Sequence, residues 1–343
     1  MRRCALAWLA DATLFCLAPI AASSFRTQSV ARTAYEQSYL PAAHNWEFRR
    51  QFRSADRLFN AFDYGHAILY ETLLAKSSTS EAAARLERHE LRFILDHVLR
   101  EPPDVPLSEH AIGTRYGTLV PELVATFDWT HMLHRQIYDV WADRRLDEAR
   151  KDAAIAALLR YYSSRHDLAL SDRPKSMALM EGRRYSLAFR QASPRFNGLI
   201  WSYHWLQMAL YDALMAGDSQ ANAQSRVDST IGRFWSMIDG EPSRMPSVMP
   251  MSAAVAPMFS TRYPAAAIIF DNLHALHDVA ADILASPTVS RADKRVAILE
   301  ALAEYRDDTT EVTSRDEWLE MSHAMGVERM GGVAVPPAGS RRP

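Results

Sequence analysis

The chain has 343 residues, of which 48% are hydrophobic, with 39 basic against 41 acidic residues and two cysteines. These values are typical of a globular protein and exclude a disordered, collagen-like or disulfide-stapled chain. The formal charge of −2, with no clustered basic segment, gives no electrostatic basis for binding nucleic acid. Glycine accounts for 12 residues, about half its usual share, which disfavours sheet turns and favours helices.

The first residues have the layout of a secretory signal peptide. Two arginines precede an apolar run, and small residues follow at positions 21–24. We therefore predict a signal peptide over residues 1–22, cleaved near Ala22, and a periplasmic or secreted protein. Asp11 interrupts the apolar run, which leaves an uncleaved anchor or a weak signal as the alternatives. No later stretch of 18 or more apolar residues occurs, so we expect no membrane span after cleavage.

Helices are predicted in four pairs, each made of an apolar helix followed by a more polar one. The predicted pairs, in chain order, are 45–76 with Glu81–Leu99, Tyr116–Asp143 with Asp147–Ser164, Phe196–Ala216 with Ala221–Ile238, and Pro264–Ala285 with Arg291–Tyr305. A short helix over Ser314–Met325 follows the last pair. No alternating run rich in Val, Ile and Thr occurs in the mature chain, so no sheet is expected.

Three irregular stretches separate the pairs, at Glu101–Glu109, Ala169–Pro194 and Gly240–Pro257. They are longer than the usual links of helical bundles, and long loops often cover a site. Because no composition break interrupts the order of inner and outer helices, we predict one all-α domain over residues 23–330. The expected architecture is a multi-helix bundle or toroid of about four repeated helical hairpins. A flexible C-terminal tail is predicted over residues 331–343.

Three of the four apolar helices contain the same five-residue pattern, Phe-Asp-x-x-His. It occurs at 62–66, 127–131 and 270–274, and the fourth helix has Phe196-Asn197 followed by His204. The starting phenylalanines lie 65, 69 and 74 positions apart, the spacing expected if one helical hairpin was used four times. Asp and His three residues apart on a helix project from the same face, so both can point at one centre.

The pattern predicts a mono- or dinuclear metal centre between the inner helices. A comparable arrangement of inward carboxylates and histidines builds di-iron and di-manganese bundles, although Asp stands here in place of their Glu. Imidazole and carboxylate ligands without sulfur suit iron, manganese or zinc. The predicted ligands are Asp63, His66, Asp128, His131, His204, Asp271 and His274, with His134, His277 and Asp278 as additional ligands or as side chains that orient the others.

Two other functions fit the same residues. In one, the Asp–His pairs are structural hydrogen bonds in a non-catalytic binding or assembly protein. In the other, the chain is a helical-toroid hydrolase whose paired carboxylates, such as Asp128 and Asp271, act as acid and base. We favour a metal-dependent oxidoreductase acting with a small-molecule substrate or a redox partner, because buried Asp groups are costly unless they are paired or bind a cation. Zinc in place of iron would favour hydrolysis instead.

Two acidic residues stand near the ends of predicted apolar helices, in Tyr138-Asp139 and Tyr211-Asp212. A carboxylate at a helix C-terminus is unfavourable next to the helix dipole unless it is paired. We therefore expect Asp139 and Asp212 to bond neighbouring helices.

Overall fold

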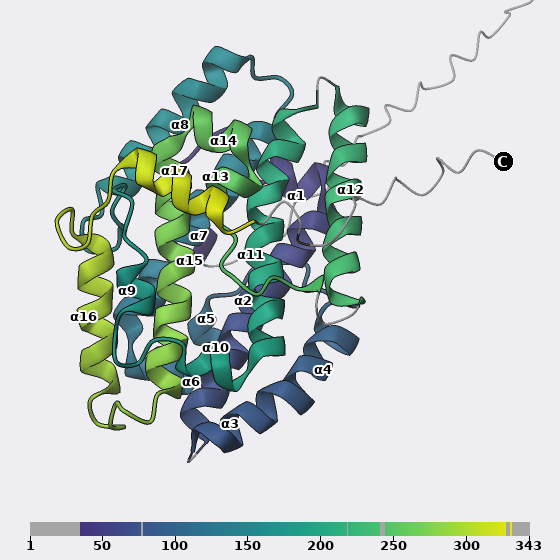
Figure 1. The fold of residues 1–343 in the computed structure, drawn as a ribbon. Helices are drawn as coiled ribbons and strands as arrows, with labels where there is room; N and C mark the ends of the chain where they lie inside the picture. The colour runs from purple at the N-terminus through teal and green to yellow at the C-terminus, as the bar shows by residue number, and fades with distance from the viewer. Residues whose placement is uncertain (1–34, 77, 218, 241–243, 327–329, 331–343) are drawn as a thin grey trace, which may run out of the picture.

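The computed structural model describes residues 35–76, 78–217, 219–240, 244–326 and 330. The predicted signal peptide and the predicted C-terminal tail lie outside these residues. Within the described part the structure is helical, and its only β contact is an isolated antiparallel bridge between Lys175 and Val312. The predicted all-α, multi-helix fold is confirmed (Figure 1).

Among the described residues, four helices of 22 or 23 residues form the centre of the molecule (Figure 1). They are α2 (Arg53–Ala75), α7 (Pro121–Ala142), α11 (Pro194–Met215) and α15 (Pro264–Ala285). In α15 every residue from Ala266 to Ala285 is buried. A helix that is buried on every face must be surrounded by other elements.

A short helix precedes each long helix, and one non-helical residue separates the two. The short helices are α1 (Glu47–Gln51), α6 (Thr114–Leu119), α10 (Ala188–Ala192) and α14 (Pro257–Arg262). The separating residues, Phe52, Val120, Ser193 and Tyr263, have φ between −137° and −123° and ψ between 50° and 63°. Proline follows the last three of them, and it disfavours the helical conformation of the residue before it while starting a helix well. The continuous helices predicted across Phe52 and Val120 were wrong at these breaks.

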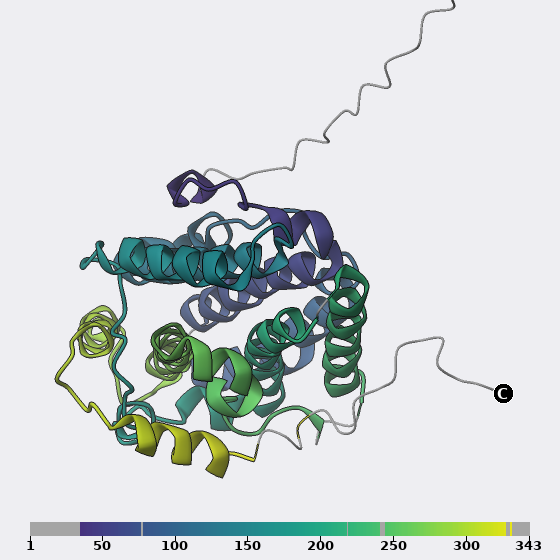
Figure 2. The same cartoon turned by 90° about the horizontal axis from the view of Figure 1, so that it is seen from above.

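An outer helix follows each long helix. After α2 the chain continues through α3 (Thr79–Arg85), the π-helical turn η2 (Leu86–Glu90), α4 (Leu91–Phe93) and the π-helical turn η3 (Ile94–Val98). The other outer helices are α8 (Glu148–Ser163), α12 (Gln220–Ile238) and α16 (Lys294–Arg306). Figures 1 and 2 show α12 and α16 on opposite flanks of the long helices. This order of elements agrees with the predicted alternation of apolar and polar helices.

The remaining helices are short and cover the ends and sides of the long ones. They are η1 (Tyr35–Ser38), α5 (Glu109–Ile112), α9 (Ala178–Glu181), α13 (Ser252–Val255) and α17 (Arg315–Ala324). Helices α9, α10 and α13 lie in stretches predicted to be irregular. The backbone N–H of Ala254 on α13 donates to Ser322 Oγ on α17 at 2.8 Å. No helix in the described part of the chain combines the length and apolar character needed to cross a membrane.

The nineteenth residue of every long helix is a carboxylate that binds the N-terminus of a short helix. The carboxylate of α2 caps the short helix before α7, and the carboxylate of α7 caps the short helix before α2. Helices α11 and α15 are related in the same way. The end of each long helix therefore lies near the start of its partner, so the members of each pair are antiparallel. The acceptors and their backbone N–H donors are Glu71 with Arg115 and Tyr116 (3.1 and 3.2 Å), Asp139 with Trp46 and Phe48 (2.8 and 2.9 Å), Asp212 with Met258 and Phe259 (3.0 and 2.9 Å), and Asp282 with Leu187 and Phe189 (both 2.9 Å). The prediction that Asp139 and Asp212 bond neighbouring helices is confirmed.

Candidate metal centre

Two positions on each long helix, three residues apart, face the interior of the molecule. The eleventh residues are Asp63, His131, His204 and His274, and the fourteenth residues are His66, His134, Gln207 and His277. All eight residues are at most 2% exposed. The Phe-Asp-x-x-His pattern had aligned Asp63 of α2 with Asp128 of α7. In the structure Asp63 is equivalent to His131, so the predicted alignment of the two helices was wrong by three residues. A shift of three residues keeps the same helix face, so periodicity alone does not reveal it.

The six imidazole rings at these positions pack against one another. The ring centres of His66 and His277 are 3.9 Å apart, and those of His204 and His274 are 4.0 Å apart. His131 lies 5.5 Å from His277 on the same measure. His66, His204 and His277, from α2, α11 and α15, offer nitrogen atoms that all lie within 4.8 Å of one another. These three form the candidate metal centre, and the sequence analysis had ranked His277 only as an additional ligand.

The rings of the cluster are buried with few hydrogen bonds. Both ring nitrogens of His66, His204, His274 and His277, and Nε2 of His131 and His134, have no hydrogen-bond partner in the described part of the chain. Among the described residues, the cluster has one ring hydrogen bond, between His134 Nδ1 and the Tyr211 hydroxyl at 2.8 Å. Burial lowers the pKa of all six histidines, that of His274 to about 3. The rings are therefore neutral at pH 7, which is the form of imidazole that binds metals.

The spacing of the three nitrogens suits one ion after a small contraction. Metal–nitrogen bonds to zinc are about 2.0–2.1 Å long and point to the corners of a tetrahedron, so the nitrogens on one ion lie about 3.4 Å from one another. Because the three nitrogens lie within 4.8 Å of one another, binding one ion needs them to approach one another by about 1.4 Å or less.

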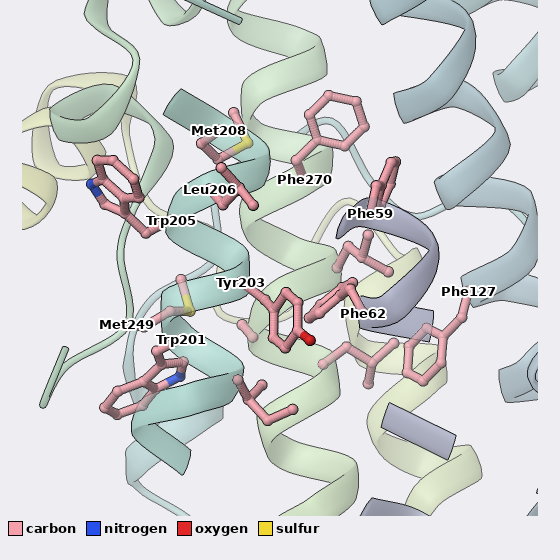
Figure 3. Packing of buried hydrophobic residues seen from close by; sticks show 14 of the residues in the cluster. Phe59, Phe62, Phe127, Trp201, Tyr203, Trp205, Leu206, Met208, Met249 and Phe270 are labelled. Atoms are coloured by element: carbon pink, nitrogen blue, oxygen red, sulfur yellow. The ribbon is translucent and has the colours of Figure 1, made fainter. Parts of the chain in front are cut away.

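Three phenylalanines of the repeated pattern surround the imidazole rings. Phe62 lies 4.1 Å from His66, Phe127 lies 4.1 Å from His277, and Phe270 stacks on His134 at 4.0 Å between ring centres. Figure 3 shows Phe62 facing Tyr203 of α11 across the interior, with ring centres 5.1 Å apart. These aromatic rings keep water away from the cluster and strengthen electrostatic interactions inside it.

Asp63 contacts two residues of α7 and not the histidine of its own helix. Its Oδ2 accepts from Arg135 Nη2 at 3.0 Å, and its Oδ1 lies 3.7 Å from His131 Nδ1. Burial raises the pKa of Asp63 to about 7, although the positive charge of Arg135 opposes this. Arg135 was not among the predicted site residues, and its only signal in the sequence was its position directly after His134 in an apolar helix.

The other three predicted acidic ligands are bonded away from the histidines. Within the described residues, neither Asp128 nor Asp271 forms a hydrogen bond or an ion pair with the histidine three positions later. Burial raises the pKa of Asp128 and Asp271 to about 6 and that of Asp278 to about 7. The hydrogen bonds join Asp128 to Ser108 Oγ (2.6 Å), Asp271 to the backbone N–H and Oγ of Ser252 (2.8 and 2.7 Å) and to Trp318 Nε1 (2.8 Å), and Asp278 to Trp201 Nε1 (2.7 Å).

A further carboxyl group, Glu109, lies beside the cluster. Its side chain is fully buried, and Oε1 lies 3.9 Å from Nδ1 of His66. Burial raises the pKa of Glu109 well above its ordinary value, the charges of Asp128 and Asp63 add to this, and the Tyr116 hydroxyl opposes it. The sequence contained no signal for Glu109, an isolated acidic residue at the end of a stretch predicted to be irregular.

The chain matches no known protein family, and it has no significant match among curated proteins or solved structures. The geometry of the histidine cluster is therefore the basis for assigning a function. Three neutral imidazoles in a closed, largely apolar interior are suited to holding a zinc, copper, iron or nickel ion.

Proposed function

We propose that this protein is an exported helical metalloprotein that binds one metal ion through His66, His204 and His277. One observation carries the proposal: three neutral imidazoles from three separate long helices bring nitrogens within 4.8 Å of one another, where no hydrogen bond satisfies them. A buried polar group without a partner costs about 1–3 kcal/mol. An ion would supply the missing partner for all three rings at once.

The donor set narrows the choice of metal. Imidazole suits zinc, copper, iron and nickel, whereas manganese prefers oxygen ligands. A bound iron or copper ion would supply electron-transfer chemistry and make the protein an oxidoreductase. The three ligand rings are at most 1% exposed, so electrons reach such a centre from a redox partner more readily than a substrate molecule does. The chain contributes three fixed, neutral rings and an aromatic enclosure that excludes water.

Metal analysis of the protein, purified from the periplasm without a His tag, tests the proposal. We expect about one ion per chain in the wild type and almost none in His66→Gln and His277→Gln. Glutamine keeps these positions polar and similar in size, and α11 itself carries Gln207 at the equivalent position. His89→Gln is the matched control, because the His89 side chain is 57% exposed and lies outside the cluster; it should retain the ion.

The same experiment separates the competing functions. Wild-type protein that stays metal-free after incubation with zinc, iron and copper salts refutes the metalloprotein. If the histidine variants of such a protein only unfold at lower temperature, the cluster has the structural role of a binding or assembly protein. An activity that survives a chelator and is lost in Asp128→Asn or Asp271→Asn would instead identify the hydrolase.

A further inference from the structure

We infer that Glu109 is a positioning residue of this centre: when the ion is bound, an oxygen of the Glu109 carboxyl group accepts the Nδ1–H of His66 and so directs the Nε2 lone pair of that ring toward the ion. The inference rests on the proposed metal site. It adds a residue from α5, outside the four long helices, to a centre otherwise built by α2, α11 and α15.

The contact between Glu109 and His66 is enclosed on all sides. Oε1 of Glu109 lies 3.9 Å from Nδ1 of His66, and the two side chains are 1% and 0% exposed. No lysine or arginine of the described residues forms an ion pair with Glu109, so His66 is the basic group nearest to this carboxylate. The distance exceeds that of a hydrogen bond, so the Glu109 side chain must move toward His66 for this bond to close when the ion binds.

The carboxylate decides which ring nitrogen is free. A neutral imidazole carries one proton, on either Nδ1 or Nε2, and the hydrogen bond made by one nitrogen determines the state of the other. With the proton held on Nδ1 by Glu109, Nε2 of His66 is unprotonated on the opposite side of the ring. Neither nitrogen of His66 has another hydrogen-bond partner in the described part of the chain, so no competing group sets the other tautomer.

The fold holds Glu109 against α2. Ser108 caps α5 by accepting from the His110 backbone N–H at 3.3 Å, and its Oγ donates to Asp128 on α7 at 2.6 Å. The end of α5 runs close to α2, since a Cβ at Gly113 would lie 3.5 Å from the Ala67 carbonyl oxygen. The backbone of α5 is thereby tied to both α2 and α7, which fixes where the Glu109 carboxylate lies.

Zinc and cobalt binding by metal-free protein tests the inference in wild type, Glu109→Gln and the matched control Glu90→Gln. Glu90 is a largely buried carboxylate, with its side chain 12% exposed, that pairs with Arg85. Loss of a carboxylate that orients a ligating histidine typically weakens metal affinity 10–100-fold. We expect zinc to bind Glu109→Gln 10–100-fold more weakly at an unchanged one-to-one ratio, with the visible bands of bound Co(II) shifted. Glu90→Gln should match wild type in both measurements.

The outcomes distinguish this inference from the proposed function. If wild type binds zinc and Glu109→Gln matches its affinity and Co(II) spectrum, Glu109 has no positioning role although the metal site stands. If X-ray absorption shows that the zinc loses an oxygen ligand in Glu109→Gln, the residue is a ligand and the inference is also wrong. Wild-type protein that binds neither ion overturns the metal site and, with it, the role of Glu109. Circular dichroism of each variant establishes that it is folded.

Discussion

The histidines of the interior combine complete burial with ring nitrogens that lack hydrogen-bond partners. Buried polar atoms in folded proteins are nearly always satisfied, and those that are not usually mark a strained or functional site. In His66, His204 and His277 both nitrogens are in this state. The three rings lie close together and are neutral. They therefore have the protonation state that metal binding requires, even without an ion.

His274 gives the clearest pH dependence, because burial lowers its pKa from 6.5 to about 3. Below pH 6.5 the unfolded chain binds a proton at His274 that the folded protein does not bind until the pH is near 3. The contribution of His274 to the free energy of unfolding is therefore fully present above pH 6.5. As the pH falls below this value, the contribution decreases by up to about 1.4 kcal/mol per pH unit.

A leucine at position 274 has a similar size and does not titrate. The free energy of unfolding of metal-free His274→Leu should therefore fall less steeply on acidification than that of wild type, by about 1.4 kcal/mol per pH unit at most. Urea unfolding of both proteins at several pH values between about 4 and 7 measures the difference. Comparing the two proteins cancels the opposite contribution of buried carboxyl groups such as Asp63. If the free energy of unfolding depended on pH equally in wild type and His274→Leu, His274 would not be buried in its neutral form.

At the scale of helices, the carboxylates that bind short-helix N-termini differ in their surroundings. Asp212 is partly exposed, and among the described residues it accepts hydrogen bonds only from the backbone of Met258 and Phe259. Asp282 is fully buried and also accepts from the buried Arg190 side chain at 2.8 Å. Asp212 and Asp282 therefore cap a short helix in the same way, but only Asp282 also neutralises a buried arginine.

We predict that Asp212→Ala lowers the free energy of unfolding by about 0.5–2 kcal/mol, the usual loss on removing a helix cap. Asp282→Ala should cost about 3–5 kcal/mol, because it leaves the Arg190 charge buried without its main partner. Chemical denaturation of both variants measures these values. The double variant Asp282→Ala/Arg190→Leu should recover part of the loss, and equal costs for the two single variants would contradict the buried ion pair.

Element prediction from the sequence succeeded where a local signal existed. The apolar period of three and four residues located all four long helices, and Pro121, Pro194 and Pro264 stand at the first position of three of them. The breaks at Phe52 and Val120 were missed, since the residues on both sides continue the helical apolar pattern. Phe52 has no proline after it, so only packing and the Asp139 cap on α1 distinguish α1 from α2.

Across the whole molecule, the candidate centre joins helices that lie far apart in the chain. His66 and His277 are separated by more than 200 residues, yet their ring centres lie 3.9 Å apart. A ligand shared by α2, α11 and α15 links three of the four long helices at the middle of their length. Metal binding is therefore expected to stabilise the fold as a unit.

Adding the physiological ion to metal-free protein should raise the free energy of unfolding by about 2.7 kcal/mol when the free ion is 100-fold above its Kd. Thermal unfolding with and without the ion measures this gain, and hydrogen exchange should show added protection in α2, α11 and α15. His66→Gln should show almost no gain. An equal rise in this variant would place the ion elsewhere on the protein.

By itself, the sequence determined the helical class, the order of inner and outer helices, and the inward orientation of the histidines. These are local properties, carried by composition and by a period that each helix has on its own. The tertiary structure alone decided that His66, His204 and His277 meet, that Arg135 and Glu109 lie beside them, and that the predicted ligands Asp128, Asp271 and Asp278 bond elsewhere. The register between distant helices is set by packing and by carboxylate caps between elements, and spacing within a single helix does not contain that information.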